Sequence, residues 1–325
     1  MLLHVKDLKT YFDTDDGVIP AVDGVSFTID EGETLGIVGE SGCGKSMTAL
    51  SILRLVPQPM GRIVSGEIWL KDRNLITLKA SEMRKVRGNE ISIIFQEPMT
   101  SLNPVFTVGN QIVEAIRYHQ GVDKKTAWQK SIDALEAVGM PSPHERVHHY
   151  PHQLSGGMCQ RVMIAMAIAC QPLLLIADEP TTALDVTIQA QILDLMRKLQ
   201  EEMRMAVMLI THDLGVIAEM AHRVLVMYAG QIVESATVAR LFEHAAHPYT
   251  QGLLNAVPKL TGPLTRRLAT IEGSIPPPTQ MPSGCRFAPR CAFATNRCRN
   301  EIPDLEKIDT DQLVRCFEWK QVIQS

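Results

Sequence analysis

The sequence has no apolar run long enough to cross a membrane. Its longest apolar stretch, residues 162–177, is interrupted by Gln171 and Pro172 and falls short of the roughly 20 residues that a spanning helix needs. Charged residues interrupt the first ten positions, which excludes a secretory signal there. We therefore expect a soluble, cytosolic chain that reaches a membrane only by docking on another protein.

The sequence also lacks dense basic runs. Its 325 residues carry 32 Lys and Arg against 36 Asp and Glu, which gives a formal net charge of −4. Nucleic-acid-binding domains are usually basic, so the charge gives no reason to expect a nucleic-acid partner. The remaining composition, 45% hydrophobic and 21% charged, is that of a globular chain with room for two or three cores.

Strand patterns alternate with helix patterns along the chain. Strands are expected at residues 2–12, 24–29, 32–40, 66–70, 91–96, 173–180, 206–213 and 223–233. Helices are expected at 46–56, 109–120, 124–139, 157–169 and 185–203, with one more between the last two strands. This order predicts an α/β fold with a mostly parallel sheet, into which a helical stretch is inserted. Residues 274–284, rich in proline, are expected to form an irregular linker.

The stretch "GESGCGKS" at residues 39–46 follows an expected strand and opens an expected helix. Glycines at this spacing let backbone N–H groups wrap a phosphate without Cβ clashes, and the helix N-terminus adds a favourable dipole. Lys45 would supply a positive charge to the β- and γ-phosphates, and Ser46 a hydroxyl to Mg²⁺. A chance glycine-rich turn is the competing interpretation, which the flanking strand and helix disfavour.

Two acids, Asp178 and Glu179, end the apolar run "LLLIADE". A parallel strand presents its last residues at the ligand edge of the sheet. Asp178 would then hold the metal, directly or through water, and Glu179 would act as general base on the attacking water. Taken alone, the pair is equally well a solvated turn, but the upstream phosphate loop favours a catalytic role.

A second anion-binding element occurs about 110 residues after the first, at "LSGGMCQR" (154–161). Ser155 and two glycines stand at the start of an expected helix, with no strand before them. One compact lobe cannot easily use both elements on a single ATP, so a second subunit facing head to tail would supply the missing half. The alternative is a plain serine N-cap followed by a glycine turn.

Taken together and in order, these motifs resemble the ATP-binding subunits of ABC transporters over residues 1 to about 260. The matching motifs are the Walker A loop (39–46), the Q-loop glutamine (Gln96), the signature (154–157), Walker B (Asp178 and Glu179), the D-loop (182–185) and the switch histidine (His212). The signature departs from the common LSGGQ, because Met158 and Cys159 precede Gln160. The resemblance implies a P-loop ABC cassette: a core with an antiparallel β subdomain (1–95 and 173–260), a helical signature subdomain (96–172) and a small cysteine-rich extension (261–325).

The resemblance also implies the site residues. Glu179 and His212 would be catalytic, and Ser46, Gln96 and Asp178 would serve Mg²⁺. The residues implied in ATP binding are Gly39, Glu40, Ser41, Gly42, Cys43, Gly44, Lys45, Ser46, Met47, Gln96, Asp178 and, from the signature, Ser155, Gly156 and Gly157. Tyr11 and Phe12 stand where an adenine-stacking aromatic is expected, and Phe12 fits the spacing slightly better.

Longer stretches resemble one branch of these ATPases, the dipeptide/oligopeptide importers. They are "FQEPMTSLNP", "YPHQLSGGM", "ADEPTTALDVTIQAQIL" and "HPYTQGLL", and further details are most like the dipeptide subunit. The resemblance implies a peripheral ATPase on the cytoplasmic face of the inner membrane. Its implied partners are two permease subunits touched by residues around 97–110, a second related ATPase subunit that makes a heterodimer, and an extracytoplasmic peptide-binding protein. Nickel or glutathione as cargo, and a soluble ABC ATPase acting on nucleic acid, remain alternatives.

Four of the seven cysteines gather near the C-terminus, at Cys285, Cys291, Cys298 and Cys316. No closely spaced pair typical of structural zinc is among them, and the wide gaps suit a larger object. Five arginines nearby would offset the charge of a thiolate-bound cluster, and the importer resemblance implies a [4Fe–4S] cluster. A zinc site and four free thiols are the alternatives.

Overall fold

The computed structural model describes residues 1–182, 184–257 and 270–324. The chain divides into two compact units, which we describe separately. The phosphate-loop unit comprises the described residues of 3–28, 34–76 and 211–325, and the helical unit comprises 1–2, 29–33 and 77–210. Within the described ranges, no helix combines the length and apolar character needed to span a membrane.

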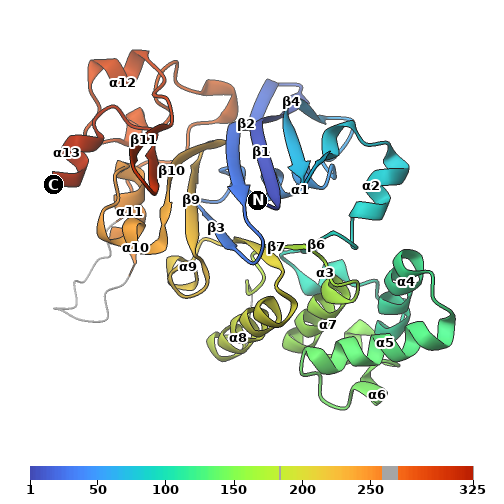
Figure 1. Ribbon diagram of the computed structural model, residues 1–325. Coiled ribbons are helices and arrows are strands. Elements are labelled where there is room, and N and C mark those ends of the chain that lie inside the picture. The colour runs from blue at the N-terminus through green and yellow to red at the C-terminus, as the bar shows by residue number, and fades with distance from the viewer. Residues whose placement is uncertain (183, 258–269, 325) are drawn as a thin grey trace. The chain divides into compact units, whose positions relative to one another are not determined.

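The N-terminal part of the phosphate-loop unit is an antiparallel sheet (Figure 1, blue and cyan). In sheet order its strands are β2 (Gly17–Ile29), β1 (Leu3–Thr14), β4 (Gly61–Leu70) and β5 (Arg73–Asn74). The expected half-buried alternation is confirmed, since Leu3, Val5 and Leu8 are fully buried. A β-bulge between Lys6 and Lys9 re-aims the strand, with Asp7 at a left-handed φ of 44°.

The same unit contains a second sheet. In order its strands are β11 (Glu306–Asp309), β12 (Gln312–Val314), β10 (Gln231–Thr237), β9 (Arg223–Tyr228) and β3 (Thr34–Val38). The pair β3 and β9 is parallel, and the other pairs are antiparallel. The helices of this unit are α1 (Lys45–Ile52), α9 (Leu214–Met220), α10 (Val238–Glu243), α11 (Pro248–Ala256), α12 (Asn296–Asn300) and α13 (Trp319–Gln324).

Two expected elements differ from the structure. The single strand expected at 223–233 is a hairpin, β9 and β10, whose turn residues Ala229 and Gly230 have φ of 46° and 84°. Two successive positive φ values are what a tight hairpin turn requires, and the apolar residues on both sides hid the turn. The helix expected at 46–56 ends at Ile52, because Arg54 takes a left-handed φ of 52°.

The C-terminal extension continues the second sheet. Strand β12 pairs with β10, with Glu234 opposite Val314. Val314 and Cys316 share a buried cluster with Ala246, against which Ile308 and Trp319 pack. Residues 274–284 are irregular except for a short 3-10 turn, as the sequence predicts. The predicted border of the extension, near 260, lies outside the described residues.

The helical unit contains three parallel strands in the order β8 (Ala206–Ile210), β7 (Leu174–Asp178) and β6 (Ile91–Ile94). Its helices are α2 (Ala80–Val86), α3 (Pro98–Ser101), α4 (Val108–Gln120), α5 (Lys124–Ala137), α6 (Pro143–Arg146), α7 (Gly156–Ile168) and α8 (Val186–Met203). Asp123 caps α5 by accepting from Lys125 N at 2.8 Å. The predicted stop at Gly139 is confirmed, since α5 ends at Ala137 and Gly139 has a φ of 67°.

Candidate functional site

The phosphate loop connects the fully buried strand β3 to the first turn of α1. Gly39 and Gly44 have φ of 153° and 105°, and a Cβ would lie 2.2 Å from Met227 O at Gly39 and 2.4 Å from Ala21 O at Gly44. No larger residue fits either position. Gly42 has a φ of 79° with open space around it, so glycine there serves backbone conformation alone. The loop is therefore specified by its glycines, as the sequence predicts.

Lys45 is buried at the start of α1 and turns back over the loop. Its Nζ donates to Gly39 O at 2.8 Å and to Glu40 O at 3.2 Å. These contacts hold the ammonium group inside the turn, where an anion bound by the loop would meet it. Cys43 is fully buried beside it, and burial raises the pKa of its thiol, so Cys43 is an inert packing residue. Ser41 and Ser46 are exposed, and Met47 is partly buried.

The two aromatic candidates on β1 are consecutive and so face opposite sides of the strand. The Tyr11 hydroxyl donates to Asp23 Oδ1 at 2.8 Å, and burial together with this bond raises the pKa of Tyr11 to about 12. Phe12 lies opposite Gly61, where an added Cβ would come within 2.7 Å of its ring. The Phe12 ring thus leans over a position without a side chain, while the Tyr11 hydroxyl is engaged within the unit.

In the helical unit, Gln96 and Glu179 meet where β6 and β7 end. The register pairs Ile94 with Ala177, so each polar residue lies two positions beyond a paired one. Gln96 Nε2 donates to Glu179 Oε2 at 3.0 Å, and Thr182 Oγ1 donates to the same oxygen at 2.9 Å. Two donors therefore fix the orientation of this carboxylate.

Asp178 and Glu179 differ in their surroundings. Asp178 is the last residue of β7 and is buried, whereas Glu179 is partly exposed. Glu179 takes a left-handed φ of 49°, and its N–H donates to Ile210 O at 2.8 Å. A left-handed conformation in a non-glycine residue is strained and is typical of functional sites. Among the described residues, no group of three or more His, Cys, Asp or Glu side chains is arranged to hold a metal ion.

The signature residues open α7 and face solvent within the helical unit. Ser155 is the N-cap and accepts from Met158 N at 3.4 Å, and Ser155 and Gly156 are exposed. A Cβ on Gly157 would lie 2.9 Å from Ile188 Cγ2, so glycine is needed for packing against α8. Gln160, by contrast, points inward: it is buried, and its Nε2 has no hydrogen-bond partner in the described part of the chain. The serine and glycines are thus available to a ligand, and Gln160 is not.

The remaining motif residues are at loop positions. His212, in the phosphate-loop unit, is exposed. Asp185 caps α8 by accepting from Ile188 N at 3.0 Å, whereas residue 183 of the same motif lies outside the described residues.

The four C-terminal cysteines line one small cavity together with apolar side chains such as Phe287 and Phe293. Cys298 and Cys316 are buried, and the other two are half-buried. Burial, reinforced by the neighbouring sulfurs, raises the pKa of Cys291 to about 11 and of Cys316 to about 12. Convergence on a cavity was not deducible from the spacing alone. These four thiols therefore stay protonated unless a bound cation displaces the proton.

Each of the arginines near these cysteines hydrogen-bonds to groups outside the cavity. Arg286 bonds to Asp23 and Ala229 O, Arg290 to Glu40, Arg297 to Glu301, Arg299 to Asn296 and Arg315 to Ile232 O and Pro303 O.

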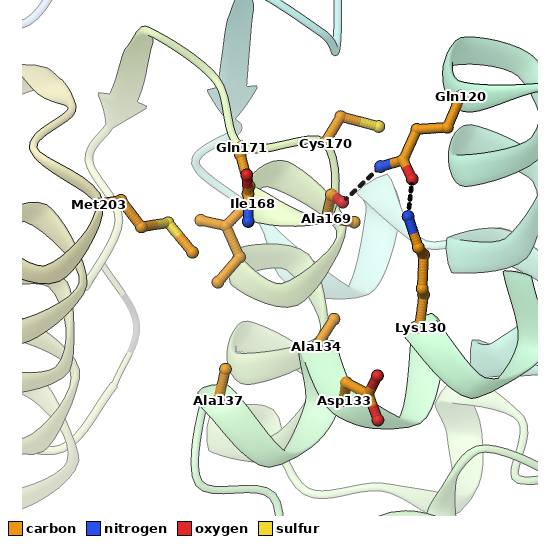
Figure 2. Close-up of a pocket in the computed structure, with 10 residues that line it drawn as sticks. All are labelled: Gln120, Lys130, Asp133, Ala134, Ala137, Ile168, Ala169, Cys170, Gln171 and Met203. Atoms are coloured by element: carbon orange, nitrogen blue, oxygen red, sulfur yellow. Dashed lines mark hydrogen bonds between the residues drawn. The ribbon is translucent and has the colours of Figure 1, made fainter. Parts of the chain in front are cut away.

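A cavity of about 490 Å³ in the helical unit contains none of the predicted site residues (Figure 2). Its lining includes Gln120, Lys130 and Cys170. Gln120 joins two elements across it, donating to Ala169 O at 3.2 Å and bonding to Lys130. Since its polar groups bond to one another, we assign the cavity no role.

The sequence gives no hint of a role for Tyr249, and it indicates Thr182 only as part of the D-loop and Arg290 only as one of five arginines near the cysteines. Tyr249 Oη accepts from Glu40 N at 2.8 Å, across a separation of 209 residues. Local pattern carries no information about such partners. Only for Thr182, three residues after Glu179, does the sequence hold a usable hint.

Comparison with known proteins places these features in context. Residues 22–182 match the family model described as ABC transporter, and residues 233–298 match the one described as oligopeptide/dipeptide transporter, C-terminal region. The chain is 52% identical over 98% of its length to the oligopeptide transport ATP-binding protein AppD of Bacillus subtilis (strain 168), covering 97% of that protein. It is 50% identical to the dipeptide transport ATP-binding protein DppD of Escherichia coli (strain K12), covering 97% of this chain and 96% of that one.

Solved structures agree in fold. The ATP-binding cassette MJ0796, in a dimeric post-hydrolysis state bound to ADP and phosphate, matches with a TM-score of 0.66 and 27% identity, over 73% of this chain and 99% of that one. A second dimeric structure of the same cassette matches with a TM-score of 0.65 and 28% identity, over the same shares of each chain.

Proposed function

The chain belongs to the family of ATP-binding subunits of oligopeptide and dipeptide ABC transporters, and from this premise we propose how its residues energise peptide import. It is an ATPase, and it drives uptake of dipeptides and short oligopeptides. The contact between Gln96 and Glu179 carries the proposal most directly, because it orients a carboxylate at the edge of a parallel sheet. Nickel or glutathione as cargo, and action on nucleic acid, have no support in the relatives' names.

The phosphate loop binds the β- and γ-phosphates of ATP. Backbone N–H groups of the loop, other than those of Glu40 and Cys43, would donate to the anion, and Lys45 adds a positive charge. Ser46, Asp178 and Gln96 supply the oxygen donors suited to Mg²⁺. When bound, Mg²⁺ neutralises charge on the phosphate oxygens. Phe12 stacks on the adenine, in keeping with its place over Gly61.

Glu179 acts as general base on the water that attacks the γ-phosphate. Thr182 and Gln96 both donate to Oε2 and hold the carboxylate at the end of the strand. His212 contacts the γ-phosphate and orients the same water. Fixing the carboxylate before the reaction avoids the reorganisation that would otherwise slow proton transfer.

The signature acts in a second subunit. Ser155 and Gly156 are exposed at the start of α7, and Gly157 follows them. They contact the γ-phosphate of an ATP held by the phosphate loop of a related but different ATPase subunit. Each ATP is thus enclosed between two chains, and its hydrolysis releases the closed dimer.

The remaining partners are membrane proteins and a substrate-binding protein. Phe106 and Val105 are exposed by 51% and 71% in the stretch 97–110, where two permease subunits dock. Exposed apolar side chains beside the Q-loop are suited to an interface that couples Glu179 chemistry to transport. The ATPase is peripheral on the cytoplasmic face of the inner membrane, and an extracytoplasmic binding protein delivers the peptide. The predicted domains divide this work: a core at 1–95 and 173–260, the signature subdomain at 96–172 and the extension at 261–325.

The extension holds a [4Fe–4S] cluster. Cys285, Cys291, Cys298 and Cys316 would hold it, because four thiols line one cavity and wide chain spacing suits a cluster better than a single ion. Within the described residues, these thiols are not already arranged as a metal site. When bound, the cluster would cross-link four points of the chain between Cys285 and Cys316. Since the thiol pKa values are raised by burial, loading the site releases protons.

Reconstitution tests the proposed function. The chain is co-purified with its permease and partner ATPase, placed in vesicles and supplied with binding protein, dipeptide and MgATP. We expect peptide accumulation coupled to ATP hydrolysis, and none from the same preparation carrying Glu179→Gln. Robust ATP hydrolysis that no peptide, binding protein or permease alters would contradict the transport role.

A further inference from the structure

Within the phosphate-loop unit, an acidic residue stands inside the anion-binding turn. Glu40 directly follows Gly39, and its side chain is partly exposed. A carboxylate next to bound phosphates repels them, because little solvent lies between charges held on one short loop. The backbone N–H of Glu40 donates to Tyr249 rather than to the loop interior, so the residue is fixed in place. Its charge therefore needs a partner if the loop is to bind an anion well.

Arg290 provides that partner from the C-terminal extension. Its Nη1 lies 3.1 Å from both Glu40 Oε1 and Glu40 Oε2. The arginine side chain is only 5% exposed, whereas that of Glu40 is 30% exposed. An ion pair with one partner shielded from water is screened less than a surface pair.

The guanidinium of Arg290 is held from every side. Nε donates to Glu272 O at 3.0 Å and Nη2 to Ile271 O at 3.2 Å. The group also lies over the rings of Tyr228 and Phe287, 5.8 and 5.9 Å from their centroids. These contacts fix the positive charge against the loop, so little entropy is lost when it pairs.

A second arginine ties the same short segment to the other side of the loop. Arg286 pairs with Asp23 and donates to Ala229 O. The adjacent residue, Gly230, donates its N–H to Cys43 O at 2.8 Å. Arg286 directly follows Cys285, and Arg290 directly precedes Cys291. The stretch between these two cysteines thus contacts the phosphate loop directly through Arg290 and indirectly, by way of the turn at Ala229 and Gly230, through Arg286.

We propose that Arg290 is a positioning residue for ATP binding: by neutralising Glu40, it lets the four-cysteine extension set the affinity of the phosphate loop for nucleotide. The inference rests on the proposed function of the loop and adds a role for the extension within it. Loss of Arg290 leaves an uncompensated carboxylate in the loop and weakens nucleotide binding. Loss of both charges restores binding, because the repulsion disappears together with its partner.

The test is a double-mutant cycle on MgATP binding. The full chain, carrying Glu179→Gln to prevent turnover, is titrated with MgATP by calorimetry, and thermal melting confirms that each variant is folded. We expect Arg290→Met to weaken binding about tenfold and Glu40→Gln/Arg290→Met to recover most of that loss. Arg290→Lys, which keeps the charge, should bind within about threefold of the parent. Arg299→Met, an exposed arginine of the same extension, is the matched control and should bind like the parent.

Salt separates a charge effect from a structural one. Raising the salt from about 0.05 to about 0.5 M should narrow the gap between Arg290→Met and the parent chain. If Arg290→Met fails to fold, Glu40→Gln alone decides: it removes the repulsion and should bind MgATP at least as tightly as the parent. The inference would be overturned if Arg290→Met and the double variant bound MgATP equally weakly. It would also be overturned if salt did not change the difference in affinity between Arg290→Met and the parent, or if Glu40→Gln bound MgATP more weakly than the parent.

The same variants in the reconstituted transporter give a second readout. Arg290→Met should raise KM for MgATP while leaving kcat nearly unchanged, because Arg290 touches no reacting group. If the wild-type complex fails to transport peptide, that result counts against the proposed function alone. The double-mutant cycle measures MgATP binding to the isolated chain and does not depend on transport.

Discussion

The amide of Gln96 donates to the carboxylate of Glu179 across the ends of two adjacent parallel strands, with 3.0 Å between Nε2 and Oε2. Gln96 directly precedes the stretch 97–110, which carries exposed apolar side chains, and Glu179 is the residue proposed to activate water. One hydrogen bond thus joins the surface proposed for the permease to the proposed base. A movement of Gln96 changes the orientation of the carboxylate directly.

Replacing Glu179 by glutamine keeps the shape of the side chain and removes its basicity. We expect MgATP to bind with nearly unchanged affinity and kcat to fall by a factor of about 10² to 10⁴. Steady-state hydrolysis and calorimetric binding measure the two quantities. Glu202→Gln, on the exposed face of α8, serves as control. Turnover at the normal rate in Glu179→Gln would remove this residue from the mechanism.

Thr182→Val removes a hydroxyl that donates to Glu179 Oε2 while keeping the side-chain volume. The carboxylate then loses one of the donors that orient it, so we expect kcat to fall about tenfold. The affinity for MgATP should not change, because the hydroxyl of Thr182 acts on the Glu179 carboxylate and not on the phosphates. Thr182→Ser retains the hydroxyl and should retain most of the activity. A loss of affinity rather than of kcat would show that the hydroxyl serves binding instead.

Gly44→Ala introduces a Cβ only 2.4 Å from Ala21 O at a φ of 105°. Since backbone must shift to make room, we expect a loss of about 2–4 kcal/mol in the free energy of unfolding and no measurable ATP binding. Gly121→Ala is the matched control, with a φ of 65° and open space around it. It should cost about 1 kcal/mol and leave ATP binding intact. Equal effects of the two substitutions would contradict the packing argument.

His247 makes the stability depend on pH. Burial, with Arg315 nearby, lowers its pKa from 6.5 to about 3, so the folded chain holds the ring neutral. The unfolded chain binds the proton first. The buried neutral ring of His247 therefore makes its full contribution to the free energy of unfolding above pH 6.5. This contribution is lost as the pH falls toward 3. Melting temperatures across this range should fall more steeply for wild type than for His247→Asn. Asparagine can still cap α11 by accepting from Tyr249 N. If the melting temperatures of the two proteins changed in parallel with pH, His247 would not be the source of the pH dependence.

Anaerobic purification tests the metal content of the extension. We expect a brown protein with broad visible absorbance and about four iron and four sulfide ions per chain. Cys316→Ser should lose this absorbance and the iron. Cys170→Ser, a half-buried cysteine of the helical unit, should keep both. A colourless preparation that retains zinc would favour a zinc site over the cluster. A preparation without any metal would favour four free thiols.

Motif residues were predictable where local sequence decides conformation. The glycines of the phosphate loop, the cap at Ser155 and the end of β7 at Asp178 each follow from positive φ, capping or strand patterning within a few residues. The hairpin at Ala229 was missed because alanine rarely takes a positive φ and its flanks are mostly apolar. Turn type could not be read from such a pattern.

Long-range partners were not predictable in the same way. Arg290 and Glu40 are 250 residues apart, and the arginine's neighbours in sequence indicated only a cysteine-rich tail. We expected the nearby arginines to offset the charge of a cluster. That expectation did not indicate that two of them reach toward the phosphate loop. Such pairings depend on how the sheet orders its strands, which neither residue spacing nor local periodicity determines.

The pairing of β12 with β10 has a consequence for any shortened form of the chain. Strand β10 is buried almost throughout, including Glu234, which accepts from Gln312 Nε2 at 2.8 Å. A protein ending before residue 306 would leave that strand as an unpaired sheet edge, and Glu234 would lose one of its donors. The shortened chain would associate with other copies of itself through that edge. Deleting the C-terminal extension would therefore yield an ATPase that aggregates rather than a minimal functional one.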